Sequence, residues 1–215
     1  MTSEQWVDFV RLHLGEIDPS KQYHRKFVKL ALSVSWENLV FDTYRRTPHE
    51  LDALTKSYGD EGTPLQVVLN GDTGEYYTSL PSNIVIIDRI GSGVIEVSTL
   101  QGQAVTFVPV SSYEKRISRN VEVASVVSTI PYCVEDKKIV YTSMNNDIVN
   151  AGVRMKLVVP FDAYGSTEHV PVPAGQTQRF LESVLSTLGV VVNEELINNN
   201  TNTRSNGRPT RTGND

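Results

Sequence analysis

Four histidines and a single cysteine are the side chains in this sequence that are best suited to metal binding or nucleophilic chemistry. A structural zinc site needs Cys or His ligands in closely spaced pairs. His13, His24, His49 and His169 instead lie in four separate segments, so we expect them to be surface or capping residues. Cys133 lies in an apolar, strand-like stretch, which favours a buried and inert thiol over a reactive one. These residues predict no metal site.

Motifs of hydrolases and nucleotide-binding proteins do not occur in the sequence. There is no Gly-x-Ser-x-Gly nucleophile elbow and no Gly-Lys-Ser/Thr phosphate loop. Gly91-Ser92-Gly93 is too short for a dinucleotide loop and precedes a strand pattern, where a helix would be needed. Glu168-His169 is explained better by a loop of polar residues than by an acid–base pair. We therefore expect no cofactor and no enzymatic activity, and a site assembled from residues far apart in sequence is the alternative.

Composition limits the class of protein further. The chain has 215 residues, 39% of them hydrophobic, a formal net charge of −5 and a pI near 5.4. This acidic balance argues against a protein that coats nucleic acid with its whole surface. The sequence has no apolar run of membrane-spanning length and no signal-peptide pattern at its N-terminus. We expect a protein without a membrane segment that is made in the cytoplasm of its host.

The N-terminal third reads as helical. A first helix is predicted over 3–14, with Thr2 and Gln5 as reciprocal caps and Gly15 as its end. A long second helix is predicted over 19–46, starting at Asp18-Pro19. Its apolar stripe comprises Tyr23, Phe27, Leu30, Ala31, Val34 and Phe41. A short third helix is predicted over 49–58, with Gly59 as its stop.

From Leu65 onward the hydrophobic period changes from helical to extended. Hairpin turns are predicted at Asn70-Gly71, at 91–93 and at 135–137. The predicted strands cover 65–69, 75–81, 84–87, 94–97, 121–130, 132–134, 138–141 and 153–161. An amphipathic helix follows at 177–188.

These elements predict an α+β fold in three parts. Residues 1–60 form a helical lobe of two long helices and a short one. Residues 61–192 form a small, mostly antiparallel β domain that is closed by the C-terminal helix. Residues 193–215 form an extended polar tail, because so few apolar side chains cannot offset the entropy lost on ordering.

Two features of the sequence predict interaction with other chains. Arg204, Arg208 and Arg211 give the tail three positive charges, and Leu196 and Ile197 are its apolar residues. We expect this tail to lie on a neighbouring subunit, because three charges hold nucleic acid only weakly. The second feature is the generous apolar surface of the long helix, including Trp36 and Phe41. Either the β region or a partner covers that surface.

Several short motifs carry a resemblance to a known family, which covers about residues 1–190. Two or three N-terminal helices precede Tyr76-Tyr77-x-x-Leu80-Pro81, as in head-to-tail adaptor proteins of tailed bacteriophages. The chain most resembles ring proteins of crAss-like phages in four stretches, which are Asp18–Tyr23, Ala31–Glu37, Val158–Tyr164 and Pro171–Gly175.

The resemblance implies a structural virion protein of the neck or tail region. Such adaptors form homo-oligomeric rings, often twelvefold, between the portal and adjacent tail or ring proteins. They continue the DNA channel without reading its sequence, and residues 193–215 would be the arm that binds the next subunit or ring. The alternative from the residues themselves is a monomeric β-rich module that recognises carbohydrate or protein, suggested by Tyr76, Tyr77 and Tyr164 near turns.

Overall fold

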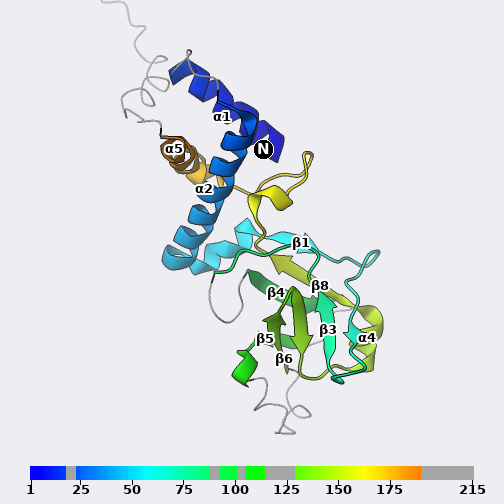
Figure 1. Ribbon diagram of the computed structural model, residues 1–215. Helices are drawn as coiled ribbons and strands as arrows, with labels where there is room; N and C mark the ends of the chain where they lie inside the picture. Colours follow the sequence, from blue (N-terminus) through cyan, green and yellow to red (C-terminus); the bar gives the residue numbers. More distant parts are fainter. Residues whose placement is uncertain (18–22, 88–92, 101–104, 115–128, 190–215) are drawn as a thin grey trace, which may run out of the picture.

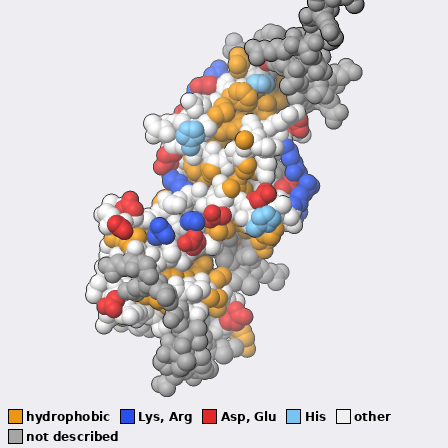
Figure 2. Space-filling model, turned by 180° about the vertical axis from the view of Figure 1, so that it is seen from behind, with side chains coloured by type: hydrophobic (Ala, Val, Ile, Leu, Met, Phe, Trp, Pro, Cys, Tyr) orange, Lys and Arg blue, Asp and Glu red, His pale blue; other side chains and the backbone are white. Residues whose placement is uncertain are grey.

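The computed structural model describes residues 1–17, 23–87, 93–100, 105–114 and 129–189. Figure 1 shows an elongated molecule, with helices at one end and β-sheets at the other, and Figure 2 shows it from behind. Helices α1 (Ser3–Ile17), α2 (Arg25–Arg46) and α5 (Thr177–Thr187) form the helical lobe. The predicted α+β class is confirmed.

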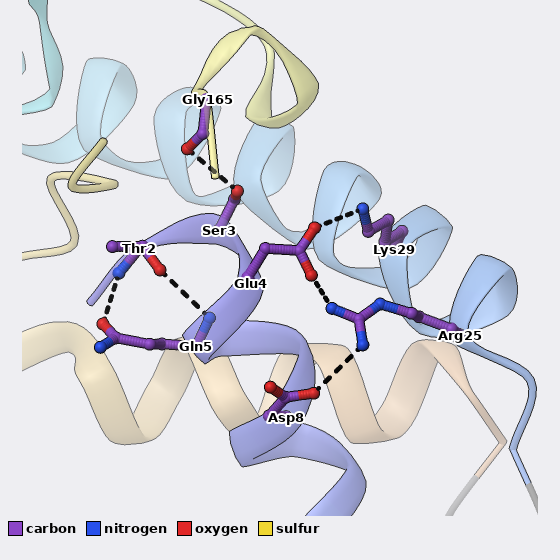
Figure 3. Close-up of polar contacts among 8 residues, drawn as sticks. All are labelled: Thr2, Ser3, Glu4, Gln5, Asp8, Arg25, Lys29 and Gly165. Carbon is purple, nitrogen blue, oxygen red and sulfur yellow. Dashed lines mark hydrogen bonds and ion pairs between the residues drawn. The ribbon is translucent and has the colours of Figure 1, made fainter. Parts of the chain in front are cut away.

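The first helix begins as predicted. The Thr2 N–H donates to Gln5 Oε1 over 2.9 Å, and the Gln5 N–H donates to Thr2 Oγ1 over 3.2 Å (Figure 3). This reciprocal cap satisfies backbone groups that have no partner inside the helix. The predicted end at Gly15 is wrong, because the helix continues through this residue to Ile17. Nothing at Gly15 calls for the left-handed backbone that makes glycine a helix stop.

The second helix begins later than the sequence suggests. His24 caps it, with Nδ1 accepting from the Lys26 N–H over 3.2 Å, so the first helical residue is Arg25. The cap expected at Asp18-Pro19 lies outside the described residues. The helix ends at Arg46, before Pro48, as predicted.

The predicted apolar stripe of α2 is largely the wrong face. Phe27, Leu30 and Val34 are 65%, 62% and 39% exposed. The residues that enter the core are Val28, Ala31, Leu32, Ser35, Trp36, Leu39, Val40 and Thr43. Apolar side chains therefore occupy both sides of α2, and spacing alone does not decide which side is covered.

The rest of the predicted lobe is only partly helical. Pro48–Leu54 is the short 3-10 helix η1, with Leu51 and Leu54 buried. The end of the expected third helix is instead strand β1 (Lys56–Tyr58). A short helix that the sequence analysis missed, α4 (Asn146–Ala151), begins where Asn145 Oδ1 accepts from the Asp147 N–H.

Two sheets form the β body. The three-stranded sheet has the order β1-β8-β4, with β8 (Val153–Leu157) between β1 and β4 (Val94–Thr99), and all pairs are antiparallel. The five-stranded sheet has the order β2-β3-β7-β6-β5. Its strands are β2 (Val68–Leu69), β3 (Tyr76–Ser79), β7 (Lys138–Tyr141), β6 (Thr129–Glu135) and β5 (Thr106–Pro109). Only the β5–β6 pair is parallel among these described strands.

Two of the predicted hairpin turns are confirmed. β2 and β3 pair on either side of the Asn70-Gly71 turn, where the Asn70 N–H donates to the Glu75 carbonyl. β6 and β7 are joined by Asp136 and Lys137, whose φ angles of 46° and 70° are those of a type I′ turn.

The third predicted turn and one predicted strand lie mostly outside the described residues, and another predicted strand is not formed. Of the turn at 91–93, the structure describes Gly93, where a Cβ would lie 2.6 Å from the Val158 carbonyl oxygen, closer than atoms can approach. The stretch 84–87 is not a strand, although the Val85 N–H donates to that same oxygen. Most of the strand expected at 121–130 lies outside the described residues.

The C-terminal helix belongs to the helical lobe, not to the β domain that it was expected to close. α5 lies against α2 and α1 (Figure 1). Its Phe180 ring meets the Trp6 ring edge to face, with centroids 5.0 Å apart. Its buried face, with Phe180, Leu181, Val184 and Leu185, is the one that the sequence predicts.

The first two predictions concern side-chain burial. Trp6 is 2% exposed and lies among Phe9 and Phe180, so Trp6→Ala should lower the free energy of unfolding by about 3–5 kcal/mol. Phe27→Ala, at an exposed position of α2, should lower it by less than about 1 kcal/mol. Chemical denaturation of both variants measures the two values. Equal losses would contradict the arrangement of α1, α2 and α5.

Candidate functional site

The four histidines lie in separate elements, and His24 is the one that caps a helix. His13 Nδ1 lies 3.0 Å from the Phe9 carbonyl, and His169 Nδ1 lies 3.0 Å from the Met1 amine. Across the described residues, no three His, Cys, Asp or Glu side chains come together as metal ligands. Cys133 is buried, as expected, and its thiol donates to Glu135 Oε1 over 3.2 Å.

One connected polar group is the pair Lys56–Glu168. Lys56 Nζ donates to Glu168 Oε2 over 2.6 Å and to the Ala163 carbonyl over 3.2 Å. Glu168 also accepts from the Gly165 N–H over 2.7 Å. The pair therefore joins strand β1 to the loop after the 3-10 helix η3 (Phe161–Ala163). This confirms that Glu168-His169 belongs to a loop of polar residues.

The pKa of Glu168 is lowered and that of Lys56 is raised, so both side chains favour their charged forms. The bond from Lys56, and then that from the Gly165 N–H, hold the pKa of Glu168 below its ordinary value. Burial alone would lower the pKa of Lys56, but the bond to Glu168 and the proximity of Tyr58 outweigh it and raise that pKa. A carboxylate held ionised in this way is suited to a structural ion pair.

A groove of about 580 Å³ lies between α2 and α5. Its charges balance, because Arg45 and Arg179 are positive, Asp42 and Glu182 are negative, and Arg179 donates to Asp42 over 2.6 Å. The groove is lined by Ser35, Asn38, Leu39, Phe41, Asp42, Arg45, Arg179, Phe180, Glu182, Ser183 and Ser186. It has a mixed polar and apolar wall without a reactive group.

The outer face of α2, defined here as Phe27, Leu30 and Val34, is the most exposed apolar feature of the helical lobe. Figure 2 shows hydrophobic side chains gathered on the reverse face of this lobe, between charged residues. Burying such side chains against another protein removes apolar area from water and is favourable. The face can therefore bind another apolar surface.

The basic side chains beside this face are mostly occupied within the chain. Arg25 forms ion pairs with Glu4 and Asp8 of α1, and Lys29 Nζ lies 2.8 Å from Glu4 Oε1 (Figure 3). These contacts fix α1 along one flank of α2 and leave the outer face open.

The residues predicted to form an interface lie in different environments. Trp36 is fully buried by the chain itself, so its assignment to an interface is wrong. Phe41 is half-buried and lines the groove. Tyr164, one of the tyrosines suggested for ligand recognition, is buried against Trp36. The tail residues Leu196, Ile197, Arg204, Arg208 and Arg211 lie outside the described residues.

The sequence left open whether the β region or a partner covers the apolar surface of the long helix. It did not single out the outer face of α2, because Phe27, Leu30 and Val34 were grouped in one stripe with the buried Ala31. The signal that could have found it is the presence of apolar residues on two opposite sides of one helix.

Comparisons of the chain with protein-family models, with curated proteins and with solved structures return no match. Within the described part of the chain, no helix has both the length and the apolar character required to cross a membrane.

The Lys56–Glu168 pair generates a prediction about pH. A carboxylate with a lowered pKa stabilises the fold above its ordinary value, 4.5, and this contribution is lost as the pH falls through the lower pKa of the folded state. The difference in free energy of unfolding between the wild type and Glu168→Gln should therefore be largest near neutral pH and shrink below pH 4.5. Urea denaturation from pH 7 to pH 3 measures it.

The matched control is Glu61→Gln, in the loop after β1, where the side chain is exposed and has no hydrogen bond or ion pair with a described residue. Its difference from the wild type should stay small at every pH. A Glu168→Gln difference that does not change with pH would show that the ion pair contributes nothing to stability.

Proposed function

We propose that this chain is a structural virion protein that forms a ring between the portal and the tail of a bacteriophage. The proposal starts from the resemblance of residues 1–190 to head-to-tail adaptors. In this role the ring continues the DNA channel, without sequence-specific DNA binding, and contacts the portal and adjacent tail or ring proteins. The chain would act by assembly and not by catalysis.

One observation carries the proposal. Large apolar side chains are exposed on separate parts of the molecule, in the helices, at the edge strand β2 and near β5. They include Leu12, Phe27, Leu30, Val68, Leu69, Ile86, Val108 and Tyr113. A subunit of a ring is contacted on two sides by its neighbours and on others by the rings above and below, so it needs several contact surfaces. A module with one ligand site needs only one.

The polar groups that the structure brings together support a scaffold. Lys56–Glu168 joins the loop after η3 to β1. Lys156 Nζ lies 2.8 Å from Glu96 and 3.0 Å from Asp52, which connects β8 to β4 and to η1. Ion pairs of this kind position elements relative to one another.

The experiment that tests the proposal is the native mass of the full chain, measured alone and after mixing with the portal protein of the same genome. We expect a closed ring of many copies in at least one of the two samples. A monomer in both would overturn the proposal and favour a monomeric binding module.

Truncation after Val192 is the accompanying variant. The described core ends before this residue, so the truncated chain should keep its circular dichroism spectrum. Loss of the proposed arm should weaken ring formation or portal binding. Full assembly of the truncated chain would show that residues 193–215 are not the arm.

A further inference from the structure

The outer face of α2 has the residue spacing of a helix–helix seam. Phe27, Leu30 and Val34 follow one another at intervals of three and four, and Phe41 and Tyr44 continue the same series after Glu37. A repeat of 3.5 residues keeps one side of a helix in contact with a partner helix. The sequence series thus points to an α-helix as the partner.

The rest of the lobe already occupies the other side of α2. Val28, Leu32, Trp36 and Leu39 are buried on that side, where α2 meets α1, α5 and η1. The outer face cannot turn inward without exposing these residues. No described element of the chain covers this face, so a second copy of the chain can do so.

Oppositely charged side chains lie at the two ends of the outer face, and they favour one orientation of a partner helix. Lys26 precedes Phe27, and Glu37 follows Val34 by one helical turn. Among the described residues, neither side chain has an ion-pair or hydrogen-bond partner, whereas Arg25 and Lys29 are bound to α1. A second α2 that runs antiparallel brings each Lys26 toward the Glu37 of the other copy. A parallel copy would bring like charges together, which is unfavourable.

We propose that the outer face of α2 packs antiparallel against the same face of a second copy of this chain, across a two-fold axis. Leu30 of one copy then lies beside Val34 of the other, and Phe27 covers the helix near Glu37. The contact is self-complementary, as a two-fold interface must be.

The contact is short and should be correspondingly weak. From Phe27 to Glu37 a helix rises about 15 Å, at about 1.5 Å per residue. This is less than the extent of a standard interface, so we expect a dissociation constant on the order of 10 µM or weaker.

A two-fold contact pairs copies and cannot by itself close a ring. It goes beyond the proposed function and does not depend on it. In a ring-forming protein the same contact would join two rings face to face.

The experiment is sedimentation velocity of the full chain over a concentration series up to a few hundred micromolar. Leu30→Glu should halve the mass of the largest species, from dimer to monomer or from paired to single ring. The matched control is Arg11→Glu, which places the same carboxylate at an exposed position of α1 that is not among the apolar side chains of the proposed ring contacts. This control should leave the mass unchanged. An unpaired wild type at every concentration, or equal masses for the wild type and Leu30→Glu, would overturn the proposal.

A charge exchange tests the antiparallel arrangement. Lys26→Glu and Glu37→Lys should each weaken the pairing about threefold or more, and the double variant should restore it. A double variant that pairs no better than the single variants would overturn the antiparallel direction. Portal binding tests the proposed function separately, so the two proposals can fail independently.

Discussion

The arrangement of the molecule depends on one buried contact, between Trp36 of α2 and the segment that follows strand β8. The indole N–H donates to the Val159 carbonyl over 2.8 Å, and the ring meets the edge of Tyr164. A buried N–H group is more stable with an acceptor, so this bond favours the observed rotation of α2 against the β body. Since α1 and α5 pack on α2, the whole helical lobe is placed by the same contact.

The rotation of α2 also determines which side chains are left outside. With Trp36 directed inward, Phe27 and Leu30 point away from the core, and the chain has no described element to cover them. The proposed self-association would then follow from how the core is built. A helix with two apolar sides can bury one within its own chain and leave the other for a second molecule.

Local features of the fold were predictable because they depend on neighbouring residues. The reciprocal cap of Thr2 and Gln5, the turn at Asp136 and Lys137, and the buried face of α5 follow from rules that act over a few positions. Features that depend on contacts between distant segments were not predictable from the sequence. The start of α2, the extended backbone at Lys56–Tyr58 and the packing of α5 on α2 require knowledge of which segments meet.

The candidate interaction surface was only half predictable for the same reason. The sequence pointed to excess apolar surface on the long helix, but Trp36, its largest apolar side chain, is the one that the core takes. The large ring of Trp36 gains much from full burial, but residue size alone does not decide the outcome, because Phe27 stays at the surface. Arg25 and Lys29 are neutralised by α1, and the proposed antiparallel pairing rests on the charges that remain at Lys26 and Glu37.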